Sequence, residues 1–582
     1  MIKDKMNKLK FRLQPNLTNE AMPFAPDEQS FAQWLDLLSS KNGYEICREL
    51  ASAFHVMNSM DVSPRFRFTC LYQAIPLVNE VAERLESVYL DSGFPLSEEE
   101  DSNVEILVWI YTQLTMSFSD LSHQLESIDS SWSKQEQAQI LFSAMYAASQ
   151  VLLHISQVYA SVQKGFWLNC YRNYMRAETL ELLNIPVNMN HVKHKTIASI
   201  FKQMLVFSCC DTDCFRVREM NTLFNLLEEC VETIRLTNAV APGAIQGVFQ
   251  FNLDIDEAPT KCMPPLTEPQ NNTRYIATLP VVNFLITAAQ KRRKDQKSDY
   301  RFIDKDLLFR VAEVLTKKRI RKYTRIVSTD NARGYIGFKP IVSMLAKIQG
   351  VDNETIKVKS AHDPRIAGRW QAPDLDLVPE GDEIAYNLNQ KKNGHLAIDP
   401  KAAKIHKLGA LASSGNKIWS QPEPIELLNK IPFGDFVILN NSIKGYALIW
   451  NSEDQRIKVG ELFAVQQQGF KELEIGQIRR ISRLEDEGLI LGIELMGMRS
   501  ELVWIILLGI NKQQGQVAIY VPADSILHQP ESIILGAHYL KPEQTIEVHR
   551  RDQRVLYRIG KLLHVTAALQ HVELVAINEG SS

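Results

Sequence analysis

A short turn in the C-terminal half has residue types that could hold a small polar ligand. Asn440, Ser442 and Gly445 occur as Asn-x-Ser-x-x-Gly at the end of a predicted strand, within FVILNNSIKGYALIW. The side chains of Asn440 and Ser442 each donate and accept hydrogen bonds. We expect Gly445 to supply the positive φ that a tight turn requires, because glycine has no Cβ. Such a turn is suited to the edge of a polar ring or to a phosphate.

Two other clusters of reactive residues have simpler interpretations. Cys209, Cys210 and Cys214 lie together in SCCDTDCF, but no second CxxC or His pair completes a tetrahedral metal site. We therefore expect buried, reduced thiols, as is typical of free cysteine. The acidic stretch NLDIDEAP at 252–259 is predicted to be a solvated loop, since clusters of one sign of charge usually face water.

The sequence lacks the short motifs that mark common enzyme classes. It contains no GxxxxGK[ST], no strand-bound GxGxxG, no HExxH and no convincing GxSxG elbow. Its histidines are scattered, so no nucleophile, base and orienting group can be named together. We expect a binding protein and not an enzyme, without a metal or a cofactor.

The N-terminal part of the chain, 1–240, is predicted to form an all-helical domain. Two capping boxes, Ser97-x-x-Glu100 and Ser133-x-x-Glu136, stand before apolar runs. The second run has apolar residues at the spacing of one helix face. These features favour long, packed helices.

The rest of the chain changes character several times. Polar, Pro-rich and Gly-rich segments give way, from Phe436 onward, to short β-branched and aromatic runs, which are typical of a small antiparallel barrel or two joined barrels. The predicted segments are a linker and helix at 241–300, a helix, Arg-rich arm and first barrel strand at 301–345, a flexible insertion at 346–430, a β-barrel at 431–506 and a β-rich segment at 507–582. The fold class is α+β multidomain, with an all-α N-terminal half followed by an antiparallel β-barrel and a further β-rich segment.

Length and charge narrow the class of protein. The chain has 582 residues, too many for a single hydrophobic core. Its formal net charge of -3 argues against broad nucleic-acid or membrane binding. The basic N-terminus lacks the apolar core of a signal peptide, and no apolar run is long enough to span a bilayer. These observations predict a cytoplasmic protein with no membrane span.

The stretch from Phe436 to Gly497 resembles the PilZ family of bacterial cyclic di-GMP receptors. PilZ domains carry [D/N]xSxxG on a barrel strand, followed by a Gly-plus-apolar strand, a GxVxR-type strand and a GxxxGIxF-type strand. The counterparts here occur in that order, as NNSIKG, KVGELFAVQ, IGQIRRIS and GLILGIELMG. The resemblance implies a PilZ-like barrel with cyclic di-GMP as ligand, held in part by Asn440, Ser442 and Gly445.

PilZ domains also use an upstream RxxxR element, the arm, whose guanidinium groups hold phosphates and guanine. Such bidentate contacts suit Arg better than Lys. By this resemblance the arm is Arg321-x-x-x-Arg325, with Arg319 and Lys322 adding positive charge. The structural alternative is a basic helix end, where cations favour the helix dipole.

A second pair competes for the role of the arm. Arg365 and Arg369 have the same spacing and also precede Asn440. More than a hundred residues separate Arg325 from Asn440, whereas in ordinary PilZ domains the arm lies a few tens of residues upstream. We interpret the additional residues as an insertion between the first and second barrel strands.

Three hypotheses follow for the function. The first is a cyclic di-GMP receptor that couples nucleotide binding to a helical output or partner-binding domain through different affinities for two arrangements. The second is a degenerate PilZ-like scaffold that binds protein partners and no nucleotide. The third, a nucleic-acid-binding barrel, ranks below them because few basic residues accompany Tyr446, Trp450 and Phe463.

Overall fold

The structure is a computed structural model that forms two compact units. The first unit comprises Met1–Gly334, Phe433–Phe470 and Gly476–Leu495, and the second comprises Tyr335–Pro432, Lys471–Ile475 and Met496–Ser582. The residues that it describes are 21–124, 132–189, 192, 195–240, 246–262, 272–291, 304–316, 323–352, 427–452, 454–484, 488–497, 499–508, 515–525, 529–536, 540–550, 553–566 and 569–577.

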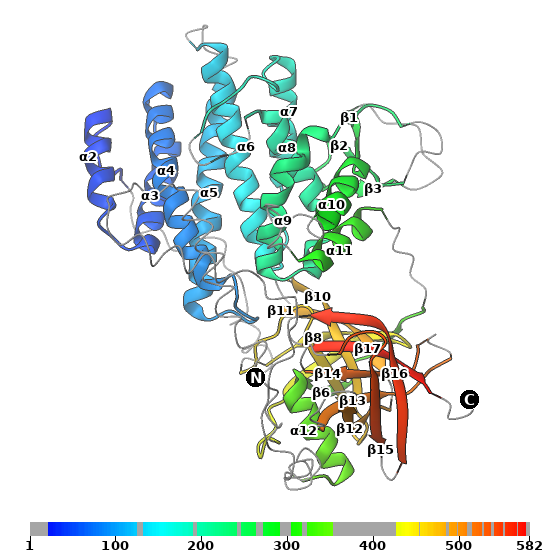
Figure 1. Cartoon of the computed structure of the whole chain (residues 1–582). Coiled ribbons are helices and arrows are strands. Elements are labelled where there is room, and N and C mark those ends of the chain that lie inside the picture. The colour runs from blue at the N-terminus through cyan, green and yellow to red at the C-terminus, as the bar shows by residue number, and fades with distance from the viewer. Residues whose placement is uncertain are drawn as a thin grey trace, which may run out of the picture. The chain divides into compact units, whose positions relative to one another are not determined.

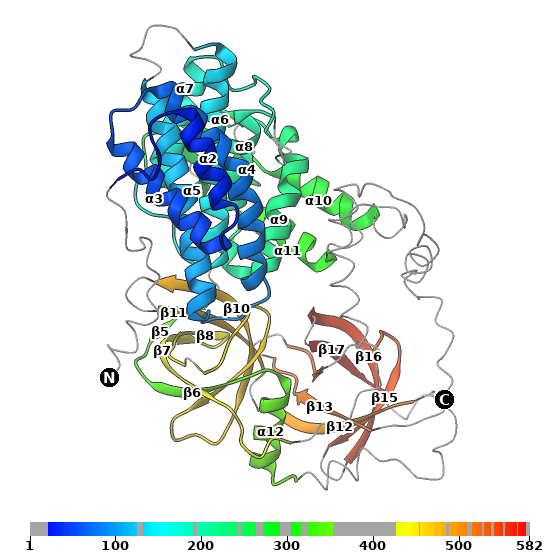
Figure 2. The same cartoon turned by 90° about the vertical axis from the view of Figure 1, so that its left-hand side faces the viewer.

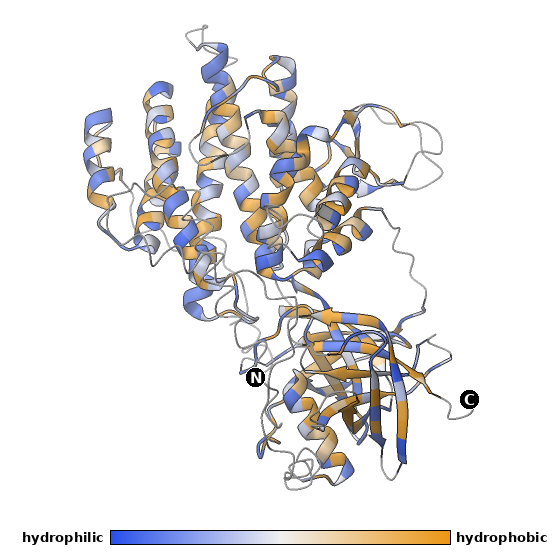
Figure 3. Ribbon diagram, in the orientation of Figure 1, coloured by the Kyte–Doolittle hydropathy of each residue, from blue (hydrophilic) through white to orange (hydrophobic). Residues whose placement is uncertain are grey.

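The N-terminal half of the first unit is a bundle of helices (Figure 1). They are α2 (Glu28–Leu38), α3 (Gly43–Ser59), α4 (Pro64–Tyr89), α5 (Glu98–Gln124), α6 (Lys134–Gln157), α7 (Phe166–Thr179), α8 (Ile197–Ser208) and α9 (Val217–Cys230). Hydrophobic residues run along the central helices, and hydrophilic residues gather toward many helix ends (Figure 3). This distribution buries the apolar stripes of neighbouring helices against one another.

Helices α5 and α6 are largely buried. Both begin at the capping boxes that the sequence predicts. The backbone N–H of Glu100 donates to Ser97 Oγ over 3.3 Å, and that of Ser97 donates to Glu100 Oε2 over 2.7 Å. Ser133 and Glu136 make the same reciprocal pair at α6. Among the described residues, α6 is the one helix long and apolar enough to cross a membrane, and 83% of that window is buried inside the protein.

Residues 241–300, predicted as a linker and helix, contribute most of a small sheet. Its strand order is β1-β4-β2-β3, and the strands are β1 (Leu236–Thr237), β2 (Val248–Asn252), β3 (Thr260–Lys261) and β4 (Thr273–Ala277). Helices α10 (Leu279–Lys291) and α11 (Lys305–Thr316) follow and pack against each other. The sequence signal covered only β2 of these strands. β1 and β3 have two residues each and are too short to give one, and β4, although it has five residues, was not predicted.

Strands β5 to β11 form the first barrel. They are β5 (Ile326–Val327), β6 (Asn331–Ile336), β7 (Gly434–Ser442), β8 (Gly445–Trp450), β9 (Leu462–Gln467), β10 (Glu474–Leu484) and β11 (Gly488–Gly497). Their order is β5-β7-β6-β9-β10-β11-β8, and an additional β7–β8 pairing closes the ring. β5 and β6 pair with successive parts of β7. Chain segments that precede and follow 337–433 therefore lie side by side.

Two glycines make room for the aromatic core of this barrel. Gly334 on β6 lies opposite Gly434 on β7. A Cβ atom on Gly434 would lie 2.2 Å from the Trp450 ring, and one on Gly334 would lie 2.5 Å from the Phe463 ring. The two rings pack edge to face with centroids 5.9 Å apart. Any larger residue at either glycine would displace this core.

The second unit contains a closed barrel of its own, seen from another side in Figure 2. Its strands are β12 (Glu501–Leu507), β13 (Gln516–Val521), β14 (Ser532–Leu535), β15 (Thr545–Arg550), β16 (Gln553–Thr566) and β17 (Leu569–Ala576). The order around this ring, β12-β13-β14-β17-β16-β15, is the order of β6-β7-β8-β11-β10-β9 in the first barrel. The segment predicted as one barrel, 431–506, thus extends into β12, which pairs in the second barrel.

Helix α12 (Phe338–Gln349) packs on this second barrel although it follows β6 in the chain. Gln349 Oε1 accepts the backbone N–H of Leu502 over 2.9 Å. A Cβ atom on Gly536 would lie 2.7 Å from the ring of Phe338. The remainder of the predicted insertion at 346–430 lies largely outside the described residues.

Candidate functional site

The Asn-x-Ser-x-x-Gly sequence forms the hairpin between β7 and β8. Ser442 and Gly445 face each other across a turn of two residues, and the Ser442 hydroxyl donates to the Gly445 carbonyl over 3.3 Å. The register shifts between Ile438 and Asn440. Such a bulge increases the local twist and redirects the side chains that follow it. Asn440 and Ser442 are both partly exposed at this end of the barrel.

Gly445 is required for a reason other than the one that the sequence suggests. Its φ does not lie in the left-handed region, so the prediction of a positive φ is wrong. A Cβ atom at Gly445 would instead lie 2.0 Å from the carbonyl oxygen of Ile493 on β11. The neighbouring Lys444 carbonyl accepts the N–H of Leu495 over 2.9 Å. The hairpin is therefore pressed against the β11 backbone at a point where no side chain fits.

Arg325 lies immediately before β5, which runs antiparallel to the motif strand. Ile326 pairs with Asn441 and Val327 pairs with Asn440, and the N–H of Ser328 donates to the Leu439 carbonyl over 3.1 Å. Arg325 itself is exposed. The backbone thus brings the end of the Arg-rich segment to the hairpin, despite the long separation in sequence.

Of the predicted cations, the structure describes Arg325 alone. Arg319, Arg321 and Lys322 lie outside the described residues, and so do Arg365 and Arg369. Of the two RxxxR pairs, only Arg325 therefore has a position, and that position is beside the motif.

Three apolar side chains next to the motif were not anticipated. Ile326, Val327 and Ile443 keep 68%, 82% and 52% of their surface exposed, which is high for such residues. Asn441 adds a buried side-chain oxygen that has no hydrogen-bond partner within the described part of the chain. A polar atom left in this state has lost its water without a replacement. The alternation of inward and outward residues along β5 and β7 could have predicted that these side chains are exposed. That prediction would have required the pairing register of the two strands.

Charged side chains of β10 and β11 lie next to the hairpin. Glu494 on β11 is the register partner of Gly445, and its carboxylate accepts Arg479 Nε over 2.9 Å. The next residue, Arg480, pairs over 2.9 Å with Asp213 of the helical bundle. Two neighbouring β10 side chains therefore make different contacts. Arg479 binds Glu494, which pairs with the hairpin, and Arg480 binds Asp213, which lies between α8 and α9.

Within the first unit, the barrel is tied to the helical bundle by hydrogen bonds and ion pairs. Phe94 and Ile457 exchange two backbone hydrogen bonds of 2.8 Å each. Arg456 pairs with Glu100 over 2.9 Å. Burial disfavours the charged form of Glu100, but hydrogen bonds from Ser92, Ser97 and Arg456 outweigh it and lower its pKa to about 2. Glu100 thus stays ionised and serves both its helix cap and the barrel.

A second ion pair of this junction is almost buried. Arg483 on β10 keeps 3% of its side chain exposed and reaches Asp101 over 3.4 Å. Burial raises the pKa of Asp101, while Arg483 opposes that shift. Removing one member would leave the other charge desolvated, which is more costly than losing an exposed pair.

The cysteine cluster in SCCDTDCF and the acidic stretch at 252–259 have structural roles. Burial raises the pKa of the Cys209 and Cys210 thiols, so both are held in the neutral form. Within the described part of the chain, no group of three His, Cys, Asp or Glu side chains could hold a metal ion. Asp254 and Glu257 are exposed, as predicted for a solvated loop. Asp256 is only partly exposed and accepts the backbone N–H groups of Gly165 and Leu168 at the start of α7. A carboxylate there satisfies unpaired N–H groups and the helix dipole.

Comparison with known proteins places both halves of the chain in one group. Residues 29–242 match the family model described as cyclic-di-GMP receptor FimW, N-terminal domain, and residues 248–501 match the model of its middle PilZ domain. The cyclic-di-GMP receptor FimW of Pseudomonas aeruginosa is 22% identical over 524 residues, which cover 86% of this chain and 82% of that protein. No solved structure matches the chain. The second match ends where β12 of the second barrel begins.

Proposed function

Because this chain belongs to the FimW-type family of PilZ-containing cyclic-di-GMP receptors, we propose that it binds cyclic di-GMP at its first barrel. The ligand lies against Asn440, Ser442 and Gly445, with Arg321 and Arg325 as the arm. The observation that carries this assignment is the pairing of β5 with β7, which puts Arg325 next to the hairpin. The name of the Pseudomonas aeruginosa relative supports the choice of ligand.

The chemistry of the site suits a cyclic dinucleotide. Two phosphates require charge-assisted donors, and Arg supplies them in a fork that fits phosphate oxygens. The hairpin adds hydroxyl and amide groups that hydrogen-bond to a base edge. The exposed faces of Ile326 and Val327 add apolar surface on which a flat ring would bury area.

Calorimetric titration of the full chain with cyclic di-GMP tests the proposal. We expect saturable binding that is lost in Arg321→Ala/Arg325→Ala, because two charge-assisted phosphate contacts disappear. The matched control is Arg365→Ala/Arg369→Ala, which has the same spacing and should bind as the unchanged chain does. Loss in the control alone would move the arm to Arg365 and Arg369. No binding by the unchanged, folded chain would refute the receptor and favour the scaffold.

We propose further that nucleotide occupancy is communicated to the helical bundle through β10. The supporting contacts are the register pair of Gly445 with Glu494, the Glu494–Arg479 ion pair and the adjacent Arg480–Asp213 ion pair. Hydrogen exchange with and without cyclic di-GMP measures this coupling. We expect the ligand to slow exchange around Asp213, and this effect to shrink in Arg480→Ala while the binding affinity stays unchanged. An equal effect in both proteins would exclude this route.

The remaining parts of the proposal concern the setting of the protein. We propose that it acts in the bacterial cytoplasm, where its ligand is made, as a receptor without catalytic activity, cofactor or resident metal. The helical bundle is the part that we propose to bind a protein partner, since the nucleotide site belongs to the barrel. An assay of cyclic di-GMP after prolonged incubation with the protein should recover the ligand intact.

A further inference from the structure

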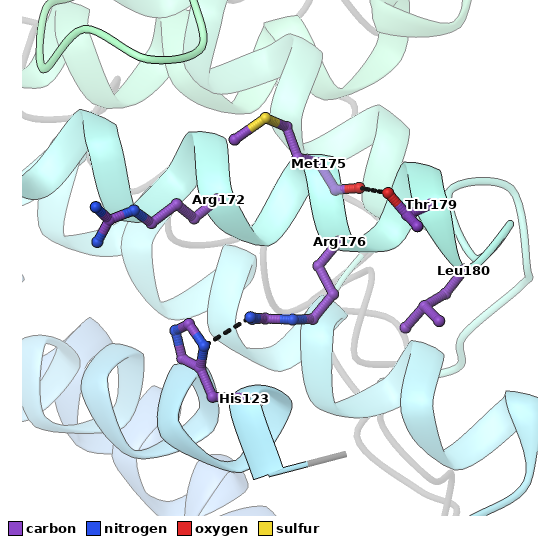
Figure 4. A pocket seen from close by; sticks show the side chains of 6 residues that line it. All are labelled: His123, Arg172, Met175, Arg176, Thr179 and Leu180. Carbon is purple, nitrogen blue, oxygen red and sulfur yellow. Dashed lines mark hydrogen bonds between the residues drawn. The ribbon is translucent and has the colours of Figure 1, made fainter. Parts of the chain in front are cut away.

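A basic hollow on the helical bundle lies on elements that take no part in the proposed nucleotide site. Its volume is about 430 Å³, and it is lined by His123, Arg172, Met175, Arg176, Thr179 and Leu180 (Figure 4). The size falls within the usual range for ligand pockets, ~300–1,000 Å³. Three of the six lining side chains carry basic groups, two are apolar, and none is acidic.

Helical spacing brings these side chains together. Arg172, Met175, Arg176 and Thr179 occur at intervals of three and four residues on α7, so they share one face of that helix. His123 comes from the last turn of α5. The hollow is therefore built between two packed helices, which hold its shape better than a loop would.

Two of the basic side chains are already oriented by the protein. Arg176 Nη1 donates to Ser122 Oγ over 2.8 Å, and Arg176 Nη2 lies 2.6 Å from His123 Nδ1. Since guanidinium only donates, Nδ1 accepts, which leaves His123 Nε2 as the protonated nitrogen and a further donor. Figure 4 shows the two side chains pointing toward each other. Preorganised donors cost less entropy when they bind a partner.

Arg172 is available for an incoming group. Its side chain is exposed, and within the described residues it makes no hydrogen bond or ion pair. The nearby Glu178 is occupied by Arg274, over 3.5 Å. The hollow thus offers a cation that nothing in its lining neutralises.

We propose that this hollow is a docking site for an acidic side chain of a protein partner, flanked by an apolar residue of the same partner. The cations suit a carboxylate, and Met175 and Leu180 suit the apolar neighbour. Arg and Met are enriched at protein interfaces, and Met adapts to irregular partners. No Phe, Tyr or Trp side chain lines the hollow, so it lacks the large aromatic rings on which nucleobases usually stack. The inference rests on the proposal of a protein partner for the bundle and is independent of nucleotide binding.

A selection from a random twelve-residue peptide display library tests the site, with the full chain as bait and cyclic di-GMP absent. We expect enriched peptides that share Asp or Glu next to an apolar residue. The affinity of an enriched peptide, measured by fluorescence anisotropy, should fall at least about tenfold in Arg172→Glu, because like charges in contact cost more than ~1.4 kcal/mol. Arg172→Glu is chosen because Arg176 also joins two helices.

The matched control is Arg84→Glu, which reverses an exposed Arg on α4 and should leave the affinity unchanged. Enrichment of peptides without acidic residues, no enrichment, or equal binding by Arg172→Glu would overturn the proposal. Competition by added cyclic di-GMP at equal affinity for the unchanged chain and for Arg321→Ala/Arg325→Ala would also overturn it, because the hollow would then be a nucleotide site. If calorimetry shows no binding of cyclic di-GMP, the result of this peptide test keeps its meaning.

Discussion

Glu86 is a half-buried carboxyl group in the helical bundle, held by amide side chains. Its Oε1 accepts Gln157 Nε2 over 2.6 Å and Asn221 Nδ2 over 2.9 Å. Gln157 in turn accepts the hydroxyl of Tyr89. Burial outweighs these hydrogen bonds and raises the pKa of Glu86 to about 7. The folded protein therefore favours the protonated carboxyl across a range where the unfolded chain is ionised.

This raised pKa predicts that stability falls as the pH rises. Since the folded pKa of about 7 lies above the ordinary value of 4.5, the contribution is complete below pH 4.5 and is lost between there and about pH 7. The loss is about 3 kcal/mol, because each pKa unit is worth ~1.36 kcal/mol. Glu86→Gln should flatten this part of the pH dependence, because the amide has no charge to bury.

Urea unfolding followed by circular dichroism at a series of pH values measures the effect. His154, whose pKa burial lowers to about 4, changes stability in the opposite sense as the pH falls below 6.5, and it remains in both proteins. The same slope between pH 5 and 7 in Glu86→Gln and in the unchanged chain would contradict the assignment to Glu86.

At the scale of elements, the approach of the β7–β8 hairpin to β11 gives a second prediction. Gly445→Ala would place a methyl group 2.0 Å from the Ile493 carbonyl, so one backbone must move. We expect a destabilisation of about 1–3 kcal/mol and weaker cyclic di-GMP binding, because the hairpin carries Asn440 and Ser442. Thermal unfolding and calorimetry measure the two effects.

A glycine on the partner strand provides the control. A Cβ atom at Gly492 meets only Arg480 Cβ, at 3.3 Å, so Gly492→Ala should cost clearly less and leave nucleotide binding nearly unchanged. Equal losses in the two variants would show that the close approach at Gly445 is not the cause.

Much of the element content could be predicted from sequence. The capping boxes at Ser97 and Ser133 mark α5 and α6, and the strand predicted as GYALIW is β8 without change. β17 was missed because only Ala567 and Ala568 separate it from β16, a connection without Gly, Asn, Asp or Pro to mark a turn.

Long-range geometry explains the other misses. The requirement for glycine at position 445 comes from the Ile493 carbonyl on β11, a strand distant in sequence. The role of Asp256 comes from the N–H groups at the start of α7. Neither partner is near in sequence, so local propensity carries no information about it. The motif itself was visible because its residues are adjacent in the chain.

At the scale of the molecule, the two barrels share a strand order but differ at one end. In the second barrel, Arg550 makes two hydrogen bonds to Glu501, of 2.7 and 3.1 Å, and its guanidinium lies 4.6 Å from the Tyr520 ring centre. The hydroxyls of Tyr520 and Tyr557 both donate to Glu531. The carboxylates would repel a phosphate, and the Arg is already satisfied. This end is closed to an anionic ligand.

We therefore expect one nucleotide-binding barrel in each chain. In calorimetry, Arg550→Ala should change neither the affinity nor the stoichiometry for cyclic di-GMP, whereas Arg321→Ala/Arg325→Ala should leave no residual heat. Residual binding in the Arg321/Arg325 variant that disappears when Arg550→Ala is added would instead show a second site.

The neighbouring positions of β6 and β7 impose an order on synthesis. Gly334 and Gly434 are register partners, yet the ribosome makes them about a hundred residues apart, an interval of roughly 5–20 s at ordinary elongation rates. Until then, the helical segments and Arg325 emerge without β7, the strand that pairs with β5 next to Arg325. A nascent chain that stalls in this interval would therefore hold the helical segments without the proposed nucleotide site.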